Sequence, residues 1–163
     1  MLIKMSEVNF SFEFNQEDVE YLRTVLATFG QIDGSQAIMR SLSLGITKII
    51  RKGKTNLMAS NGEKTGNLKR SFRKKGVKKW LSAYGGFHRG KGGGNHAHLI
   101  DRGTDDRWQK KTGRYTGSIS AKNPNSGSKF WTKAVESTGP DAMKHTMDVI
   151  YRELEKIIDK KHI

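Results

Sequence analysis

Two amphipathic helical patterns, separated by a glycine-rich centre, constrain the fold of this chain more than any other feature. In each pattern, apolar residues recur at the spacing that gives a helix one buried face and one solvated face. They are Ile38, Leu42, Ile46, Ile49 and Ile50 in the first pattern, and Met143, Met147, Ile150, Tyr151, Leu154, Ile157 and Ile158 in the second. The first helix should begin after Asp33-Gly34-Ser35 and end near Gly53, and the second should begin at Pro140. Gly45 lies inside the first pattern, where it either weakens the helix by about 1 kcal/mol or marks a close packing contact.

A strand and a shorter helix precede these patterns. Apolar and polar residues first alternate, which is typical of a strand with one buried face. The apolar positions are Val8, Phe10, Phe12 and Phe14. Asn15 then stands at the N-cap position of a helix whose apolar residues continue to Phe29, and Gly30 should end it.

The centre of the chain, residues 63–135, contains short apolar groups separated by glycine, asparagine and serine. This pattern indicates a short antiparallel sheet with long loops. Two glycine-rich loops are expected, from Tyr84 to Asn95 and from Thr112 to Lys129, and both should be mobile in isolation. The length of 163 residues fits a single domain, 1–163.

The positive charge is concentrated in this centre. The formal net charge is +14, yet residues 1–33 carry six acids against two bases and residues 140–163 carry five of each. Between Lys64 and Ile100 there are ten bases and no acid. Such a field attracts an anionic partner, and it does not distinguish nucleic acid, an anionic membrane or an acidic protein surface.

The composition argues against several classes of protein. There is no cysteine, so neither a disulfide framework nor a thiolate site is possible. No segment approaches the roughly 18 apolar residues of a membrane span, and the opening Met1–Met5 is too short and too soon polar for a signal peptide. We therefore expect a soluble protein, made in the cytoplasm, with no membrane partner.

Histidines and aspartates in the centre offer a weak case for metal chemistry. Imidazoles and carboxylates bind zinc or iron, and carboxylates hold magnesium in nucleases. The residues concerned are His88, His96, His98, Asp101, Asp105 and Asp106. Their spacing matches no metal or nuclease motif, and the nearby glycines lack the lysine-serine or lysine-threonine pair of a phosphate loop. We expect no metal, no cofactor and no catalytic residue.

Three segments, in this order, resemble the tail-component or head-tail joining family of tailed bacteriophages. Lys64–Phe72 is similar to the family's Thr-Gly-x-Leu-basic-x-Ser-apolar signature. His96–Thr104 stands where the family has an aromatic-rich strand followed by Phe-Gly-Thr, with Arg102 in place of the aromatic residue. Lys129–Val135 is similar to the Pro-Phe-Leu-x-x-Ala turn that opens the C-terminal helix, without the proline.

The resemblance implies an α+β fold in which a short antiparallel sheet packs against a long helix and a C-terminal helix. Residues 34–163 would form the family-like core, with residues 1–33 as an added strand and helix. It also implies a virion structural protein of the neck, a tail-completion or minor tail protein without catalytic activity. Such a protein assembles in the bacterial cytoplasm as a homo-oligomeric ring between the connector or adaptor and the tail tube or tail terminator.

A ring through which DNA passes would use bases in its lumen or against an acidic neighbouring ring. The bases expected to face DNA or a partner are Lys69, Arg70, Arg73, Lys74, Lys75, Lys78, Lys79, Arg89 and Lys91, and the expected loop contacts are Gly85, Gly86, Gly92, Gly93 and Gly94. Trp80, Tyr84 and Phe87 interleave with the bases, either as stacking platforms for single-stranded nucleic acid or as anchors of the sheet. The alternative function is sequence-independent nucleic-acid binding by this segment.

Overall fold

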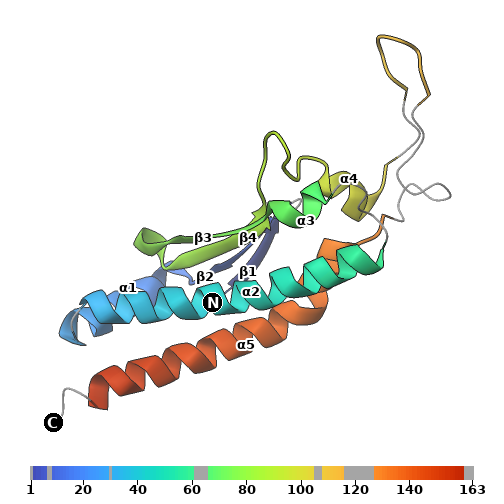
Figure 1. Cartoon of the computed structure of the whole chain (residues 1–163). Helices are drawn as coiled ribbons and strands as arrows, with labels where there is room; N and C mark the ends of the chain where they lie inside the picture. The colour runs from blue at the N-terminus through green and yellow to red at the C-terminus, as the bar shows by residue number, and fades with distance from the viewer. Residues whose placement is uncertain are drawn as a thin grey trace.

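The computed structural model describes residues 2–6, 9–29, 31–60, 66–104, 108–115 and 127–159. These residues form an α+β structure, which confirms the predicted fold class (Figure 1). The strands are β1 (Leu2–Ser6), β2 (Asn9–Glu13), β3 (Phe72–Val77) and β4 (Ser82–Phe87). The helices are α1 (Gln16–Phe29), α2 (Gln31–Ala59), α3 (Asn67–Ser71), α4 (Ala97–Arg102) and α5 (Phe130–Asp159), and a 3₁₀ turn, η1 (Lys78–Trp80), joins β3 to β4.

The four strands form one antiparallel sheet in the order β1-β2-β4-β3. β2 is the strand predicted from the alternating phenylalanines, and Phe10 and Phe12 are buried on the face toward α2. β1 was not predicted from the sequence. The helix predicted after Asn15 is confirmed as α1, and the Asn15 Oδ1 atom accepts a hydrogen bond from the Asp18 amide at 2.6 Å, as expected of an N-cap.

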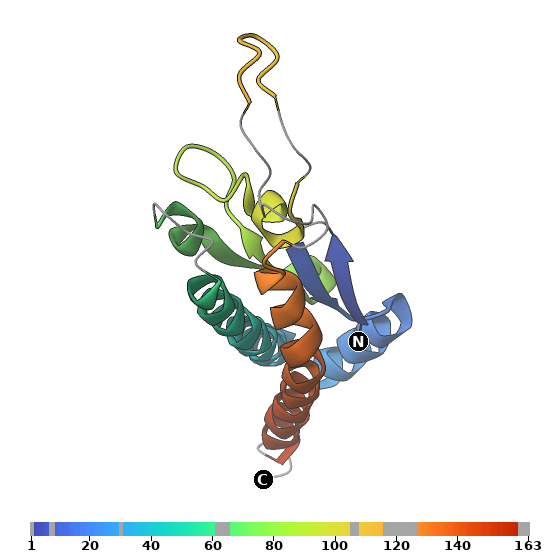
Figure 2. The ribbon, with the colours of Figure 1, turned by 90° about the vertical axis from the view of Figure 1, so that its right-hand side faces the viewer.

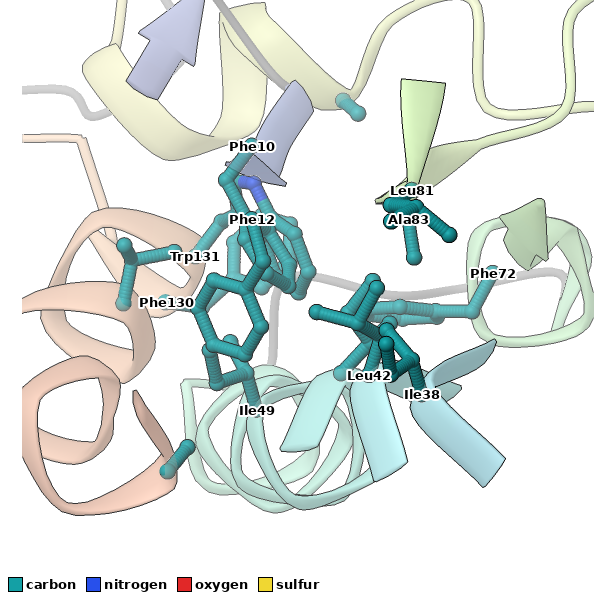
Figure 3. Close-up of a cluster of buried hydrophobic side chains, with 14 of the residues drawn as sticks. Phe10, Phe12, Ile38, Leu42, Ile49, Phe72, Leu81, Ala83, Phe130 and Trp131 are labelled. Atoms are coloured by element: carbon teal, nitrogen blue, oxygen red, sulfur yellow. The ribbon is translucent and has the colours of Figure 1, made fainter. Parts of the chain in front are cut away.

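The core lies between one face of the sheet and α2, with the start of α5 closing one end (Figure 3). α2 contributes five fully buried apolar side chains, Ile38, Leu42, Ile46, Ile49 and Leu57. The first four belong to the first helical pattern, so the periodicity predicted the buried face correctly. α5 runs beside α2, with its first turns beneath the sheet and its C-terminal part extending away from the sheet (Figures 1 and 2).

Two glycines of α2 allow this close packing. A Cβ atom at Gly45 would collide with the Thr146 hydroxyl of α5 and lie 2.7 Å from the Phe12 ring, so Gly45 marks a close contact. At Gly53 a Cβ atom would lie 2.7 Å from the Trp131 ring. The prediction that α2 ends near Gly53 is therefore wrong, because this glycine makes room for a tryptophan inside a helix that begins at Gln31 and continues to Ala59.

The predicted start of the last helix at Pro140 is also wrong. α5 begins ten residues earlier, at Phe130, and Pro140 lies inside it. Proline lacks the amide proton of a helix interior and usually ends or kinks a helix. Here the buried residues of the preceding turns, which include Phe130, Trp131 and Ala134, fix the helix against α2 and the sheet. Tertiary packing thus overrides the local signal.

Two predictions for the centre need correction. The segment His96–Thr104 contains the helix α4 and not the strand that the family pattern implies. The first glycine-rich loop does not begin at Tyr84, because β4 continues to Phe87. Gly85 has no side chain where the Phe10 ring and Ile46 approach β4, since a Cβ atom there would lie 2.5 Å from Phe10.

Replacing Gly53 by alanine should lower the free energy of unfolding by about 1–3 kcal/mol, the usual cost of overpacking a core. In an exposed helix the same change would stabilise by about 1 kcal/mol. Thr55→Ala is the matched control, because Thr55 is exposed two residues further along α2. Urea denaturation followed by circular dichroism measures the free energy of unfolding of both variants. A Gly53→Ala protein as stable as the control would contradict the tight contact with Trp131.

Candidate interaction surfaces

The basic residues of the centre follow β3, an edge strand of the sheet, and the segments at its two ends. We call this line the basic edge: Lys69 and Arg70 of α3, Arg73, Lys74 and Lys75 of β3, and Lys78 and Lys79 of η1, all exposed. From Arg73 to Val77 the strand advances about 13 Å at roughly 3.3 Å per residue. The bases therefore form an extended row and not a compact cluster, which suits an extended polyanion better than a small anion.

Strand alternation divides the bases of β3 between the two faces of the sheet. The Lys74 Nζ atom donates a hydrogen bond to the Thr47 hydroxyl of α2 at 3.0 Å, so Lys74 belongs to the helix-covered face. Arg73 and Lys75 point the other way, opposite Gly86 and Tyr84 of β4. Only some of the bases predicted to face a partner therefore lie on the same face of the sheet.

The face of the sheet away from α2, which we call the outer face, has a hollow of about 300 Å³ near β3 and β4. Arg73, Lys75, Tyr84 and Gly86 contribute to its lining. Tyr84 is 37% exposed, and Gly86 leaves the floor beside it without a side chain. The Arg73 Nη1 atom donates to the Arg70 carbonyl at 3.1 Å, which holds the guanidinium at the rim.

The three aromatic residues interleaved with the bases have different roles. Phe87 is a core anchor, with its ring centroid 4.5 Å from that of Phe72 and 5.2 Å from that of Trp131. Trp80 is 57% exposed, and the Lys79 ammonium lies 5.1 Å from its ring centroid. Tyr84 and Trp80 therefore keep the geometry of possible stacking surfaces, whereas Phe87 does not.

The glycines predicted as loop contacts also lie in different environments. Gly85 and Gly86 are strand residues of β4, and Gly93 and Gly94 are buried. A Cβ atom at Gly94 would lie 2.5 Å from the Ser71 hydroxyl, so this glycine packs against the α3–β3 junction. Gly92 is exposed at the tip of the loop, with a φ of 71° that favours glycine.

The loop after β4 is held by several hydrogen bonds, and it brings Arg89 and Lys91 to the α3 end of the basic edge. The His88 amide donates to the Ser71 carbonyl at 2.6 Å, and the Gly94 amide donates to the His88 carbonyl at 2.7 Å. The Asn95 side chain bonds to both the amide and the carbonyl of Gly90. Arg89 and Lys91 are both exposed.

Those residues considered for metal binding that the structure describes form no metal-binding cluster. His88 and His96 are exposed, and the described part of the chain contains no cluster of three potential metal ligands. Asp105 and Asp106 lie outside the described residues. Asp101, the remaining carboxylate of the nuclease hypothesis, has a different environment.

Asp101 caps the long helix α5. Its carboxylate is 1% exposed and accepts hydrogen bonds from the Trp131 amide at 2.6 Å, the Thr132 amide at 3.2 Å and the Thr132 hydroxyl at 2.5 Å. The Lys129 amide donates to the Asp101 carbonyl at 2.8 Å. A carboxylate that binds the free amides at a helix N-terminus is stabilising, so this residue joins α4 to α5.

A short hairpin-like turn, Trp108–Tyr115, which a single β-bridge closes and which we call the hairpin, was not predicted from the sequence, because Thr112–Tyr115 was assigned to the second glycine-rich loop. Trp108 and Tyr115 pair across it, with ring centroids 4.9 Å apart. The Gln109 amide donates to the Arg114 carbonyl at 2.8 Å, and Gly113 adopts a positive φ of 61° in the turn. Two aromatic residues flanking a turn with glycine were the available signal.

An apolar groove lies between α1 and the C-terminal half of α5. This α1–α5 groove has a volume of about 520 Å³, and its apolar lining includes Phe14, Leu22, Val25, Met147, Leu154 and Ile158. Asp18 and Glu155 stand among these residues, and no base is found among the described residues that line it. Tyr21 and Tyr151, also in the lining, are 71% and 58% exposed.

None of the described helices combines the length and the apolar character needed to span a bilayer. Comparisons of the chain with protein-family models, with curated proteins and with solved structures gave no match.

Asp101→Ala should lower the free energy of unfolding by at least about 2 kcal/mol, because it removes a helix cap and leaves buried donors without an acceptor. Asp148→Ala is the control, since Asp148 is an exposed acid in the middle of α5, and it should change stability by no more than about 0.5 kcal/mol. Chemical denaturation measures both. Unchanged stability of the Asp101→Ala protein would contradict the capping role.

Proposed function

We propose that this chain is a structural protein of a tailed bacteriophage or prophage, acting at the head-tail junction or in tail completion by ring-like assembly. The observation that carries the proposal is that the three family-like segments meet at Trp131. Phe72, which ends the first segment, lies 5.5 Å from Trp131 between ring centroids. Asp101 of the second segment binds the Trp131 amide, and Trp131 itself belongs to the third. This convergence supports the interpretation of the three segments as parts of one family-like core.

The exposed surfaces support a role in assembly. Trp108 and Tyr115 of the hairpin are 65% and 51% exposed. Exposed aromatic residues are enriched at protein interfaces. In this proposal the chain carries no catalytic residue, and its partners are further copies of itself, a connector or adaptor, and a tail tube or tail terminator.

In the assembled virion, the basic edge would face DNA in the lumen of the ring or an acidic surface of a neighbouring protein. Both partners can be bound through sequence-independent charge contacts. Assembly in the host cytoplasm and residence at the head-tail interface of the virion complete the proposal.

Sedimentation velocity at increasing protein concentration tests the assembly. We expect the 18.4 kDa chain to form larger species whose size reaches a plateau, because a closed ring stops growing whereas an open filament does not. Purified connector and tail proteins of the same phage should lower the concentration at which this happens. A monomer at every concentration, also in the presence of those proteins, would reject the proposal.

The outer face favours a second candidate function, sequence-independent nucleic-acid binding. Arg73 and Lys75 line the same hollow as the exposed Tyr84 and as Gly86, which has no side chain. This arrangement combines phosphate contact with base stacking. It needs no ring.

Binding of a fluorescent oligonucleotide, measured by anisotropy at about 50 mM salt and above, tests this candidate. Exchanging both Arg73 and Lys75 for glutamine should reduce the magnitude of the slope of log K against log salt by about 1–2. Lys144→Gln, an exposed base on α5, should leave the slope unchanged. Equal slopes for the two variants, or no binding by the unmodified protein, would remove this function.

A further inference from the structure

The Trp108–Tyr115 hairpin and the α1–α5 groove lie at opposite ends of the molecule. In Figure 1 the hairpin stands away from the body beyond α4, whereas α1 and the C-terminal half of α5 form the other end. Figure 2 shows the same separation after a 90° turn, with the hairpin at the top and the C-terminal end of α5 at the bottom. A contact between these two features would therefore join different copies of the chain.

The composition of the hairpin suits insertion into an apolar groove that carries acidic residues. Its sequence carries three bases, Lys110, Lys111 and Arg114, and no acid. Its two aromatic side chains are largely exposed although they contact each other. Aromatic residues together with arginine dominate the binding energy of many interfaces.

The α1–α5 groove has the complementary composition. Its lining is mainly apolar, and its charged side chains are the carboxylates of Asp18 and Glu155. The first turn of α1 holds one further acid, Glu17, next to Asp18. The groove volume of about 520 Å³ is within the ~300–1,000 Å³ typical of binding pockets, so two aromatic side chains can enter.

We propose that the Trp108–Tyr115 hairpin of one copy docks into the α1–α5 groove of the next copy. The inference rests on the self-assembly proposed above and identifies the contact that produces it. Trp108 and Tyr115 cover the apolar lining, while the bases of the hairpin face Asp18 and Glu155. Because the two surfaces differ, the contact is head-to-tail, and repetition of it closes a ring when the rotation between neighbours permits.

Two variants with one defective surface each test the docking. Trp108→Ala damages the hairpin, and Glu155→Lys places a base in the groove. Each alone should weaken self-association at least about tenfold, as expected for a central interface residue. The matched controls are Leu44→Ala, which removes an exposed apolar side chain of α2, and Glu136→Lys, which reverses an exposed acid elsewhere on α5. Both controls should associate as the unmodified protein does.

Mixing the two defective variants gives the sharper result. The intact hairpin of the Glu155→Lys chain fits the intact groove of the Trp108→Ala chain, and the two remaining surfaces are defective. Sedimentation should therefore show dimers in the mixture and nothing larger. A mixture that stays monomeric, or variants that assemble as well as the controls do, would overturn the docking while leaving assembly itself in place. Failure of the unmodified protein to associate would reject both.

Disulfide cross-linking keeps the proposal testable if a defective variant folds poorly. The chain has no cysteine, so single cysteines can be introduced by Thr112→Cys in the hairpin of one chain and by Tyr21→Cys at the groove of another. Oxidation of the mixed proteins should give a covalent dimer containing one chain of each kind. Lys144→Cys in place of Tyr21→Cys is the control, and equal yields from the two pairings would contradict the docking.

Discussion

The ring of Trp131 holds the two layers of this structure together. It lies in the first turn of α5, fills the space that Gly53 leaves on α2, and contacts Phe10, Phe72 and Phe87 from three strands. Its backbone amide is bound by Asp101, so the same residue also fixes α4. Its indole nitrogen is buried without a hydrogen-bond partner among the described residues, and this cost is consistent with a position selected for packing. Three helices, α2, α4 and α5, and three strands therefore meet at one residue.

This anchoring determines which surfaces are left for partners. Because the core lies on one face of the sheet, β3 and the outer face retain their bases and Tyr84 in contact with solvent. α5 extends beyond the aromatic cluster, and its C-terminal half packs only partly against α1, which leaves the α1–α5 groove. The hairpin stands at the other end (Figure 1). A body with a well-packed centre and unlike surfaces at its two ends is suited to head-to-tail assembly.

Much of the fold could be predicted from periodicity, because the apolar residues of β2, α1 and α2 repeat at the spacing of the element they form. The Gly139-Pro140 pair misled the prediction of α5, since no local signal encodes the contact between Trp131 and Gly53. The role of Asp101 was equally hidden: a carboxylate beside histidines suggests a metal, and only the fold places it under a helix amide 30 residues away. The bases were found as a group, but the division of Lys74 from Arg73 and Lys75 required the strand register.

Electron microscopy of the purified protein tests the central claim, that this chain is a self-assembling structural subunit, most directly. At concentrations where the chain associates, we expect closed rings of uniform size made of this chain alone. Fields that contain only particles of monomer size, or irregular aggregates without closed rings, would contradict the account.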